Sequence, residues 1–186
     1  YKKAKQEKYR SRASYKLKQL NLKFKIIKKG HKVLDLGAAP GGWMQVLREF
    51  VGSEGKVVGV DLSDIRPFEH DNVAAIKGDF TTPEVIAQIK ERIGKADVVV
   101  SDASPDISGV WDIDHICSVE LSRSALALAK DILKPGGNFL IKVFQGAEVD
   151  DFYREVKAAF NYVKRTKPKA SRDQSSEIYI VGKGLR

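Results

Sequence analysis

The sequence predicts an α/β fold, in which helices cover both faces of a mostly parallel sheet of seven strands. Short apolar segments alternate with amphipathic ones along most of the 186 residues, as strands alternate with crossover helices in such folds. One apolar segment, Val-Val-Val at 98–100, contains no polar residue, which is typical of a strand buried on both faces. The length and a hydrophobic content of 42% are those of one globular domain.

The first predicted element is a helix within residues 11–29, where apolar residues recur at helical spacing. They are Ala13, Leu17, Leu20, Phe24 and Ile27. The strands are expected at residues 33–37, 56–62, 73–80, 96–102, 138–144, 162–166 and 177–181, and the other helices at 43–50, 83–93, 114–133 and 149–160. No predicted helix separates the last two strands, so one of them should run antiparallel at the sheet edge. We expect a basic helical extension, residues 1–30, packed on a single domain, residues 31–186.

Charge is distributed unevenly along the chain, whose net charge is +9. Residues 1–30 carry twelve Lys and Arg against one acid, and residues 154–186 carry nine against three. Residues 31–153 carry twelve against twenty. If the fold brings the two ends together, they form a cationic patch that attracts a polyanion. The simpler interpretation of such charge runs is a solvated surface.

Composition also excludes several classes of protein. No segment approaches the ~18 consecutive apolar residues that a membrane span requires, and no apolar run follows the basic start as in a secretory signal. A lone cysteine, Cys117, cannot form an internal disulfide, so a reducing, cytoplasmic location is expected. We expect Cys117 to be a small buried apolar group. His31, His70 and His115 have no acids at metal-ligand spacing, so no metal site is predicted.

A glycine-rich turn joins the first predicted strand to the following helix. Its sequence is Asp35-Leu36-Gly37-Ala38-Ala39-Pro40-Gly41-Gly42-Trp43. Glycines in such a turn let a ligand approach the backbone, and the helix N-terminus orients polar groups. The spacing matches neither the dinucleotide pattern G-x-G-x-x-G nor a P-loop. Asp35 at the strand end would also repel a pyrophosphate, so a ligand without phosphates is favoured.

Acids also follow the next two predicted strands. Asp61 is placed to accept both hydroxyls of a ribose, and Asp79, beside Phe80, is placed to meet the edge and face of an adenine. Each acid taken alone is explained as a strand-end cap. Acids at three successive strand ends favour one ligand with a ribose, an adenine and a cationic tail. S-adenosylmethionine, with its ammonium and sulfonium groups, fits this description.

Further motifs stand in order along the chain. They are Arg10-Ser-Arg-Ala-Ser-Tyr-Lys16-Leu, Ser101-Asp102-Ala-Ser-Pro105, Leu140-Ile-Lys142-Val-Phe144, Lys167-Pro-Lys-Ala-Ser-Arg172 and Ser176-Glu177-Ile-Tyr-Ile-Val181. With the glycine turn, they cover nearly the whole chain. Together they resemble the FtsJ-like (RrmJ-like) ribosomal RNA 2′-O-ribose methyltransferases, a family with the class I (Rossmann-like) methyltransferase fold.

The resemblance implies methyl transfer from S-adenosylmethionine to a ribose 2′-hydroxyl of RNA, with large-subunit ribosomal RNA as the favoured substrate. It implies that Lys16, Asp102, Lys142 and Glu177 form the Lys-Asp-Lys-Glu tetrad of such enzymes. It implies cofactor contacts at Asp35, Gly41, Trp43, Asp61 and Asp79, to which we add the adjoining Gly37, Ala38, Pro40, Gly42, Phe80 and Asp102. No Asn/Asp-Pro-Pro-aromatic run follows the fourth strand, which argues for a hydroxyl target over a base amine.

The chemistry of the tetrad can be considered separately from the resemblance. A ribose hydroxyl is a weak acid that must lose its proton during an in-line displacement. Lys142 lies among apolar neighbours, which disfavour its charged form, so it could act as a general base. Asp102 would hold that amine but would also oppose its deprotonation, which leaves an orienting role open as well. Lys16 and Glu177 are expected to pair.

Basic residues precede two members of the tetrad and are candidate phosphate contacts beside the reacting ribose. They are Arg10, Arg12, Lys167, Lys169 and Arg172, together with the lysine-rich start. Tyr9 and Trp111 could stack on unpaired bases or pack within the fold.

Other functions remain open at this stage. The enzyme could act on transfer RNA or messenger RNA caps, or the chain could be a non-catalytic RNA-binding assembly factor, against which the intact tetrad argues. The glycine spacing and Asp35 disfavour a nicotinamide-dependent dehydrogenase. Ser104 has no histidine in its motif, so nucleophilic hydrolysis would lack its base.

Overall fold

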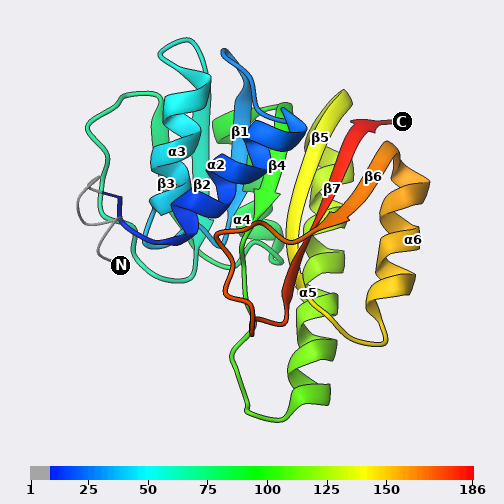
Figure 1. Cartoon of the computed structure of the whole chain (residues 1–186). Helices are drawn as coiled ribbons and strands as arrows, with labels where there is room; N and C mark the ends of the chain where they lie inside the picture. Colours follow the sequence, from blue (N-terminus) through cyan, green and yellow to red (C-terminus); the bar gives the residue numbers. More distant parts are fainter. Residues whose placement is uncertain (1–8) are drawn as a thin grey trace.

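A computed structural model of the chain describes residues 9–186 and has one seven-stranded sheet with helices on both faces (Figure 1). The strands are β1 (Lys32–Leu36), β2 (Lys56–Asp61), β3 (Val73–Lys77), β4 (Ala96–Ser101), β5 (Leu133–Phe144), β6 (Phe160–Thr166) and β7 (Glu177–Leu185). The helices are α2 (Ala13–Phe24), α3 (Gly42–Val51), α4 (Pro83–Ile93), α5 (Trp111–Ile132) and α6 (Val149–Ala159). The lysine-rich start, residues 1–8, lies outside the described residues.

The strand order is β3-β2-β1-β4-β5-β7-β6. Neighbouring strands from β3 to β5 are parallel, whereas β7 is antiparallel to both β5 and β6. From β1 the chain first adds β2 and β3 on one side, and it then returns to add β4 on the other side of β1. Connections therefore diverge at the carboxyl ends of β1 and β4, where ligands bind in open sheets of this kind.

The predicted α/β class and the seven strands are confirmed, but the antiparallel strand lies one position inside the edge. The chain passes from β6 through residues 167–176 and returns as β7 between β5 and β6. The physical reason is burial. Residues 179–182 of β7 are buried, whereas most of β6 is exposed, so the more apolar strand takes the inner position.

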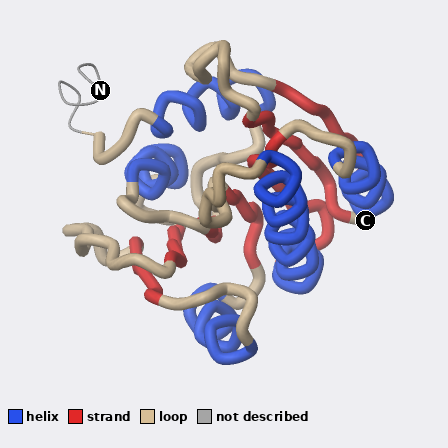
Figure 2. The backbone as a smooth tube through the Cα atoms, turned by 90° about the horizontal axis from the view of Figure 1, so that it is seen from below, coloured by secondary structure: helices blue, strands red, loops and turns tan. Residues whose placement is uncertain are grey.

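Helices lie on both faces of the sheet (Figure 2), and an apolar core on each face holds these layers together. On one face, Leu17 and Leu20 of α2 pack with Met44 and Leu47 of α3 against the sheet. On the other face, α4, α5 and α6 cover the strands. Residues of the basic extension thus share a core with the glycine-turn helix.

Helix α2 ends at Phe24, earlier than the predicted 29, because local side-chain bonds favour a turn. Lys25 has a positive φ of 53°. The Asn21 side chain accepts a hydrogen bond from the Ile27 amide at 2.8 Å and donates to the Ile27 carbonyl at 3.2 Å. Residues after Phe24 therefore form a compact loop that still buries Ile26 and Ile27.

Candidate active site

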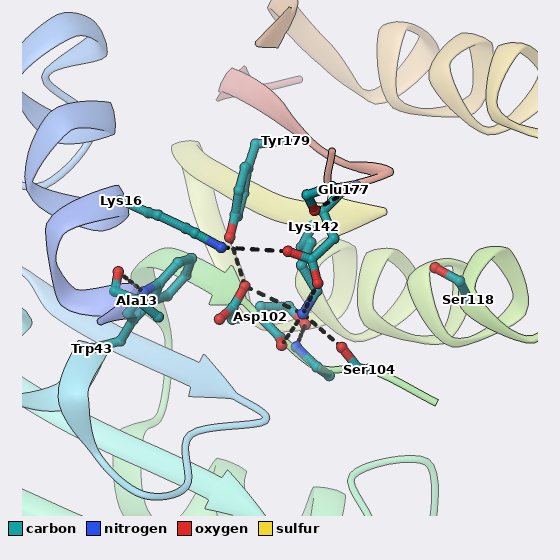
Figure 3. Close-up of polar contacts among 12 residues, drawn as sticks. Ala13, Lys16, Trp43, Asp102, Ser104, Ser118, Lys142, Glu177 and Tyr179 are labelled. Atoms are coloured by element: carbon teal, nitrogen blue, oxygen red, sulfur yellow. Dashed lines mark hydrogen bonds and ion pairs between the residues drawn. The ribbon is translucent and has the colours of Figure 1, made fainter. Parts of the chain in front are cut away.

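The four predicted tetrad residues meet at the carboxyl edge of the sheet (Figure 3). Lys16 comes from α2, Asp102 follows β4, Lys142 lies on β5, and Glu177 begins β7. The β5–β7 ladder pairs Lys142 with Tyr179 and Phe144 with Glu177. Alternate residues of a strand share a face, so this register brings Glu177 close to Lys142. Residues from four separate elements thus form one charged cluster.

Lys142 is the centre of this cluster and exposes only 7% of its side chain. Its Nζ lies 3.6 Å from Asp102 Oδ1 and 3.4 Å from Glu177 Oε1. It also donates hydrogen bonds to the Asp102 carbonyl at 3.0 Å and to Ser104 Oγ at 2.6 Å. Lys16 Nζ lies 3.4 Å from the other Glu177 oxygen. Two positive and two negative side chains therefore alternate, and each restricts the direction of its neighbour.

Tyr179 is also part of the site, although no sequence pattern predicted a role for it. Its hydroxyl donates to Asp102 Oδ1 at 2.8 Å, and its ring is fully buried next to Trp43. The pKa of Asp102 is raised, because the effect of burial exceeds the lowering by Lys142 and Tyr179. Burial and the Asp102 charge raise the pKa of Tyr179 well above its ordinary value. Its position in the sequence could have predicted this role, because Tyr179 is two residues after Glu177 and therefore lies on the same face of the strand.

A cavity of about 670 Å³ adjoins Asp102 at the ends of β1, β2 and β4. Of the predicted cofactor residues, it is lined by Gly37, Asp61, Asp79, Phe80 and Asp102. Gly37 is required in this wall, since it has a φ of +74° and an added Cβ would lie 2.5 Å from Ala103 Cα. Further walls come from the β4–α5 loop and from α5. Four of the predicted strand-end and turn residues therefore meet Asp102 around one space.

Two acids of this cavity are held by backbone amides. Asp61 Oδ2 accepts from the Ala39 amide at 2.9 Å and Oδ1 from the Ser63 amide at 2.8 Å. Asp79 accepts from the amide and hydroxyl of Thr81, and these bonds lower the pKa of Asp79. Carboxylates fixed in this way can accept further hydrogen bonds from a ligand.

Asp35 lies behind the cavity rather than in its lining. Its side chain is fully buried, and neither carboxylate oxygen accepts a hydrogen bond from the described residues. Burial, with the charges of Asp102 and Asp61, raises the pKa of Asp35 well above its ordinary value. An unpartnered buried carboxyl is costly, and a nearby cation would relieve that cost.

Of the other turn residues, Ala39 also lines the cavity, whereas Pro40, Gly41, Gly42 and Trp43 contact the N-terminal extension. Trp43 Nε1 donates to the Ala13 carbonyl at 2.7 Å, and an added Cβ on Gly42 would lie 2.3 Å from Ser11 Oγ. Gly41 has a φ of +111° and faces the Arg10 side chain. Ala38 is buried, and the Pro40 carbonyl accepts a hydrogen bond from Arg10. These five predicted cofactor residues lie outside the cavity lining, because the N-terminal extension covers most of this part of the turn.

A second cavity, of about 450 Å³, adjoins the same charged cluster at Lys16 and Glu177. Its lining includes Lys16 and Glu177 of the tetrad and the basic residues Arg12 and Arg172. Both arginines are exposed, as is Lys169. The fold thus brings the N-terminal extension and the β6–β7 loop to one site. This meets the condition under which the two basic end regions form one cationic patch.

The other two predicted RNA contacts are engaged within the protein. Arg10 donates to the carbonyls of Pro40, Arg66 and Pro67 and stacks on Phe68 at 3.8 Å. Lys167 donates to the carbonyls of Asp173 and Ser175. Arg10 therefore holds the extension against the glycine turn, and Lys167 holds the β6–β7 loop.

Cys117 corrects another expectation, because it is exposed and lines the larger cavity. It lies on the face of α5 that turns toward the β4–α5 loop, and not on the buried face. Within residues 9–186, no group of three or more His, Cys, Asp or Glu side chains could hold a metal ion. None of the described helices is long and apolar enough to span a membrane.

The strand order, the antiparallel β7 and the cavity at the carboxyl edge define a class I, Rossmann-like methyltransferase. More particularly, the chain belongs to the FtsJ-like methyltransferase family, which matches residues 9–185. It is therefore an enzyme of the methyltransferase class.

Individual relatives are similar over almost the whole chain. The ribosomal RNA large subunit methyltransferase E of Methanocaldococcus jannaschii is 57% identical, over 98% of this chain and 76% of that protein. The protein of the same name from Methanothrix thermoacetophila is 55% identical, over 100% and 71%. A solved structure assigned as a ribosomal RNA methyltransferase from Plasmodium falciparum has a TM-score of 0.84 at 32% identity, covering 95% and 98%.

Proposed function

We propose that this enzyme transfers the methyl group of S-adenosylmethionine to a ribose 2′-hydroxyl of RNA, and that its substrate is ribosomal RNA of the large subunit. The observation that carries the proposal is the position of Lys142. Its amine bridges Asp102, which lines an acid-walled cavity, and Glu177, which lines a cavity with a basic rim. The names of the relatives support ribosomal RNA over transfer RNA and caps.

The larger cavity supports the choice of cofactor. Asp61 would accept the ribose hydroxyls, and Asp79 with Phe80 would hold the adenine. Asp35 supplies an independent argument, since its buried carboxyl lacks any partner among the described residues and would be stabilised by the cationic end of the cofactor. When bound, S-adenosylmethionine supplies a methyl group that its sulfonium has already activated.

The protein itself must position the ribose hydroxyl and accept its proton. We assign Lys142 Nζ to that hydroxyl, because every group around the amine is an acceptor that fixes its direction. In its neutral form the amine accepts the proton as the oxygen attacks. Asp102, held by Tyr179, positions the amine. Lys16 and Glu177 hold each other beside it.

The smaller cavity supports RNA as the substrate. Arg12 and Arg172 stand at its rim, and Lys169 lies in the same loop as Arg172. Cationic side chains beside a reacting ribose suit phosphate contacts, which position RNA without reading its sequence. Ribosomal RNA as the substrate also agrees with the cytoplasmic location predicted from the single cysteine.

The test is to incubate the protein with labelled S-adenosylmethionine and total RNA, and to map the labelled nucleotides. Label on ribose 2′-oxygens of large-subunit ribosomal RNA is expected. The Lys142→Ala variant controls for contaminating activity. Label in transfer RNA or in messenger RNA caps would show that one of these is the substrate instead. Absence of label with intact RNA binding would favour a non-catalytic assembly factor.

A further inference from the structure

Trp111 is an exposed aromatic residue at the edge of the candidate active site. It is the first residue of α5 and is 49% exposed. Its ring is stacked on Phe144, with centroids 6.4 Å apart and planes at 27°. Phe144 lies two residues after Lys142 on the same strand face, and it pairs with Glu177 across the ladder. Lys142, Phe144 and Trp111 therefore form a row that leads outward from the reacting centre.

The fold holds Trp111 beyond the sheet instead of in the core. The first turns of α5 extend past the carboxyl ends of the strands (Figure 1). Residues at 111, 115, 118 and 122 share one helix face, and His115, Ser118 and Ser122 are buried there. The Phe144 carbonyl and amide bond to His115 and Ser118. Trp111 continues this buried row at the point where the sheet no longer covers it.

The start of α5 is also fixed in place. The Asp114 carboxylate accepts hydrogen bonds from the amide and hydroxyl of Ser108 and from the Gly109 amide. These bonds shape the loop that precedes Trp111. The indole is thus preorganised, with one face against Phe144 and about half its surface accessible.

The surroundings of Trp111 suit a base and not a phosphate. The β4–α5 loop and the first turn of α5, residues 102–116, contain no Lys or Arg but four acids. The neighbouring Ile107 and Val110 are both more than half exposed. The basic rim of Arg12 and Arg172 belongs to the smaller cavity instead. An uncharged aromatic ring can occupy the region of Trp111, whereas the RNA backbone would meet like charge there.

We propose that Trp111 stacks on an unpaired base in the RNA segment that carries the methylated ribose. This inference rests on the proposed function and specifies its substrate as locally single-stranded RNA. The phosphates would follow the Arg12 and Arg172 side, the ribose would meet Lys142, and the base would point to Trp111. Base–aromatic stacking tolerates any base because each has a π-face. Trp111 is a positioning residue in this arrangement.

The first experiment compares methyl transfer to protein-free ribosomal RNA by wild type, Trp111→Ala, Trp111→Phe and Tyr162→Ala. Tyr162 is the matched control, since it is an aromatic residue that is 47% exposed on the distant edge strand β6. Trp111→Ala should raise KM on the order of tenfold, the size of one lost stack, with a smaller change in kcat. Trp111→Phe should restore most of the affinity, and Tyr162→Ala should match wild type.

The second experiment does not depend on activity. The other tryptophan, Trp43, is buried with 3% exposure, so the wild-type emission minus that of Trp111→Phe reports on Trp111. Oligoadenylate should quench this difference signal, and an abasic ribose–phosphate chain of equal length should not. Equal quenching by both chains, or by neither, would refute stacking.

The two experiments separate the possible failures. If the wild type transfers no methyl to ribosomal RNA, the proposed function fails, and the quenching result still decides the stacking. If the wild type is active and Trp111→Ala keeps its KM on protein-free RNA, the stacking is refuted. A defect of Trp111→Ala only on assembled subunits would also refute it, and would assign the apolar surface to a protein contact.

Discussion

The two cavities differ in charge, although the ion pairs of Lys142 connect Asp102 of one to Glu177 of the other. The larger one is walled by Asp61, Asp79 and Asp102, and the smaller one has Arg12 and Arg172 at its rim. The acidic walls come from the middle of the sequence, and the basic rim comes from its two end regions. The uneven charge along the chain thus becomes an acidic and a basic cavity at one charged cluster. Changes on one side, acidic or basic, should therefore leave the other side's ligand unaffected.

The largest effect is expected where the two sides meet. Lys142→Ala should lower kcat for methyl transfer by about 10²- to 10⁴-fold, the contribution of a positioned general base. Lys142 does not line the larger cavity, so cofactor affinity measured by calorimetry should hardly change. Lys157→Ala, on the surface of α6, is the control. A kcat within twofold of wild type would remove Lys142 from the mechanism.

A change on the acidic side should affect the cofactor alone. Asp61→Ala should weaken S-adenosylmethionine binding about 10- to 100-fold, because hydrogen bonds to a carboxylate are lost. RNA affinity should stay the same. Asp64→Ala is a matched control, since this nearby acid is exposed and pairs only with Lys77 among the described residues. Equal cofactor affinities of the two variants would show that the ribose binds elsewhere.

A change on the basic side should affect RNA alone. Arg12→Ala and Arg172→Ala should each weaken RNA binding and lower the slope of log K against log salt by about one, as expected for one lost phosphate contact. Cofactor affinity should be unchanged. Arg154→Ala removes an exposed arginine of α6 and serves as the reference. An unaltered salt slope in both rim variants would mean that the arginines form only a solvated surface.

The smallest effect concerns stability. The pKa of Asp35 is raised in the folded protein, so the folded state binds the Asp35 proton more tightly than the unfolded state does. Stability from this group is therefore present at low pH and is lost as pH rises through the folded pKa. Asp35→Asn should melt higher than wild type at pH 7 without cofactor. The difference should shrink as pH falls toward 3.8, the ordinary value.

The same variant also tests whether Asp35 contributes to cofactor binding. If Asp35 stabilises the cationic end of the cofactor, added S-adenosylmethionine should raise the melting temperature of Asp35→Asn by less than it raises that of the wild type. An identical ligand-induced gain in both proteins would limit Asp35 to a role in folding.

Sequence reasoning succeeded where one residue's place follows from its own strand. Asp61 and Asp102 are examples, because parallel strands end at a common edge and carry their last residues there. Contacts between elements were harder to predict. The role of Tyr179 depends on the register of β5 with β7, and the inner position of β7 was not evident from its order in the chain.

The glycine turn shows the same limit. Its residues were predicted as one cofactor-binding group, yet Gly37 faces the cavity while Gly42 and Trp43 face the N-terminal extension. Turn spacing does not reveal which side of a turn another segment will cover. The exposure of Cys117 was missed for a similar reason, since its helix face depends on how α5 packs.

The inner position of β7 has a consequence for when the charged cluster is completed. β7 follows all other strands in chain order, yet it joins β6 to the sheet and brings Glu177 and Tyr179 to Lys142. While a ribosome is still synthesising residues 177–185, β5 has an unpaired edge, because β7 is its partner on that side. Until β7 pairs with β5, the Lys142 amine therefore lacks its contact with Glu177, and Asp102 lacks its hydrogen bond from Tyr179.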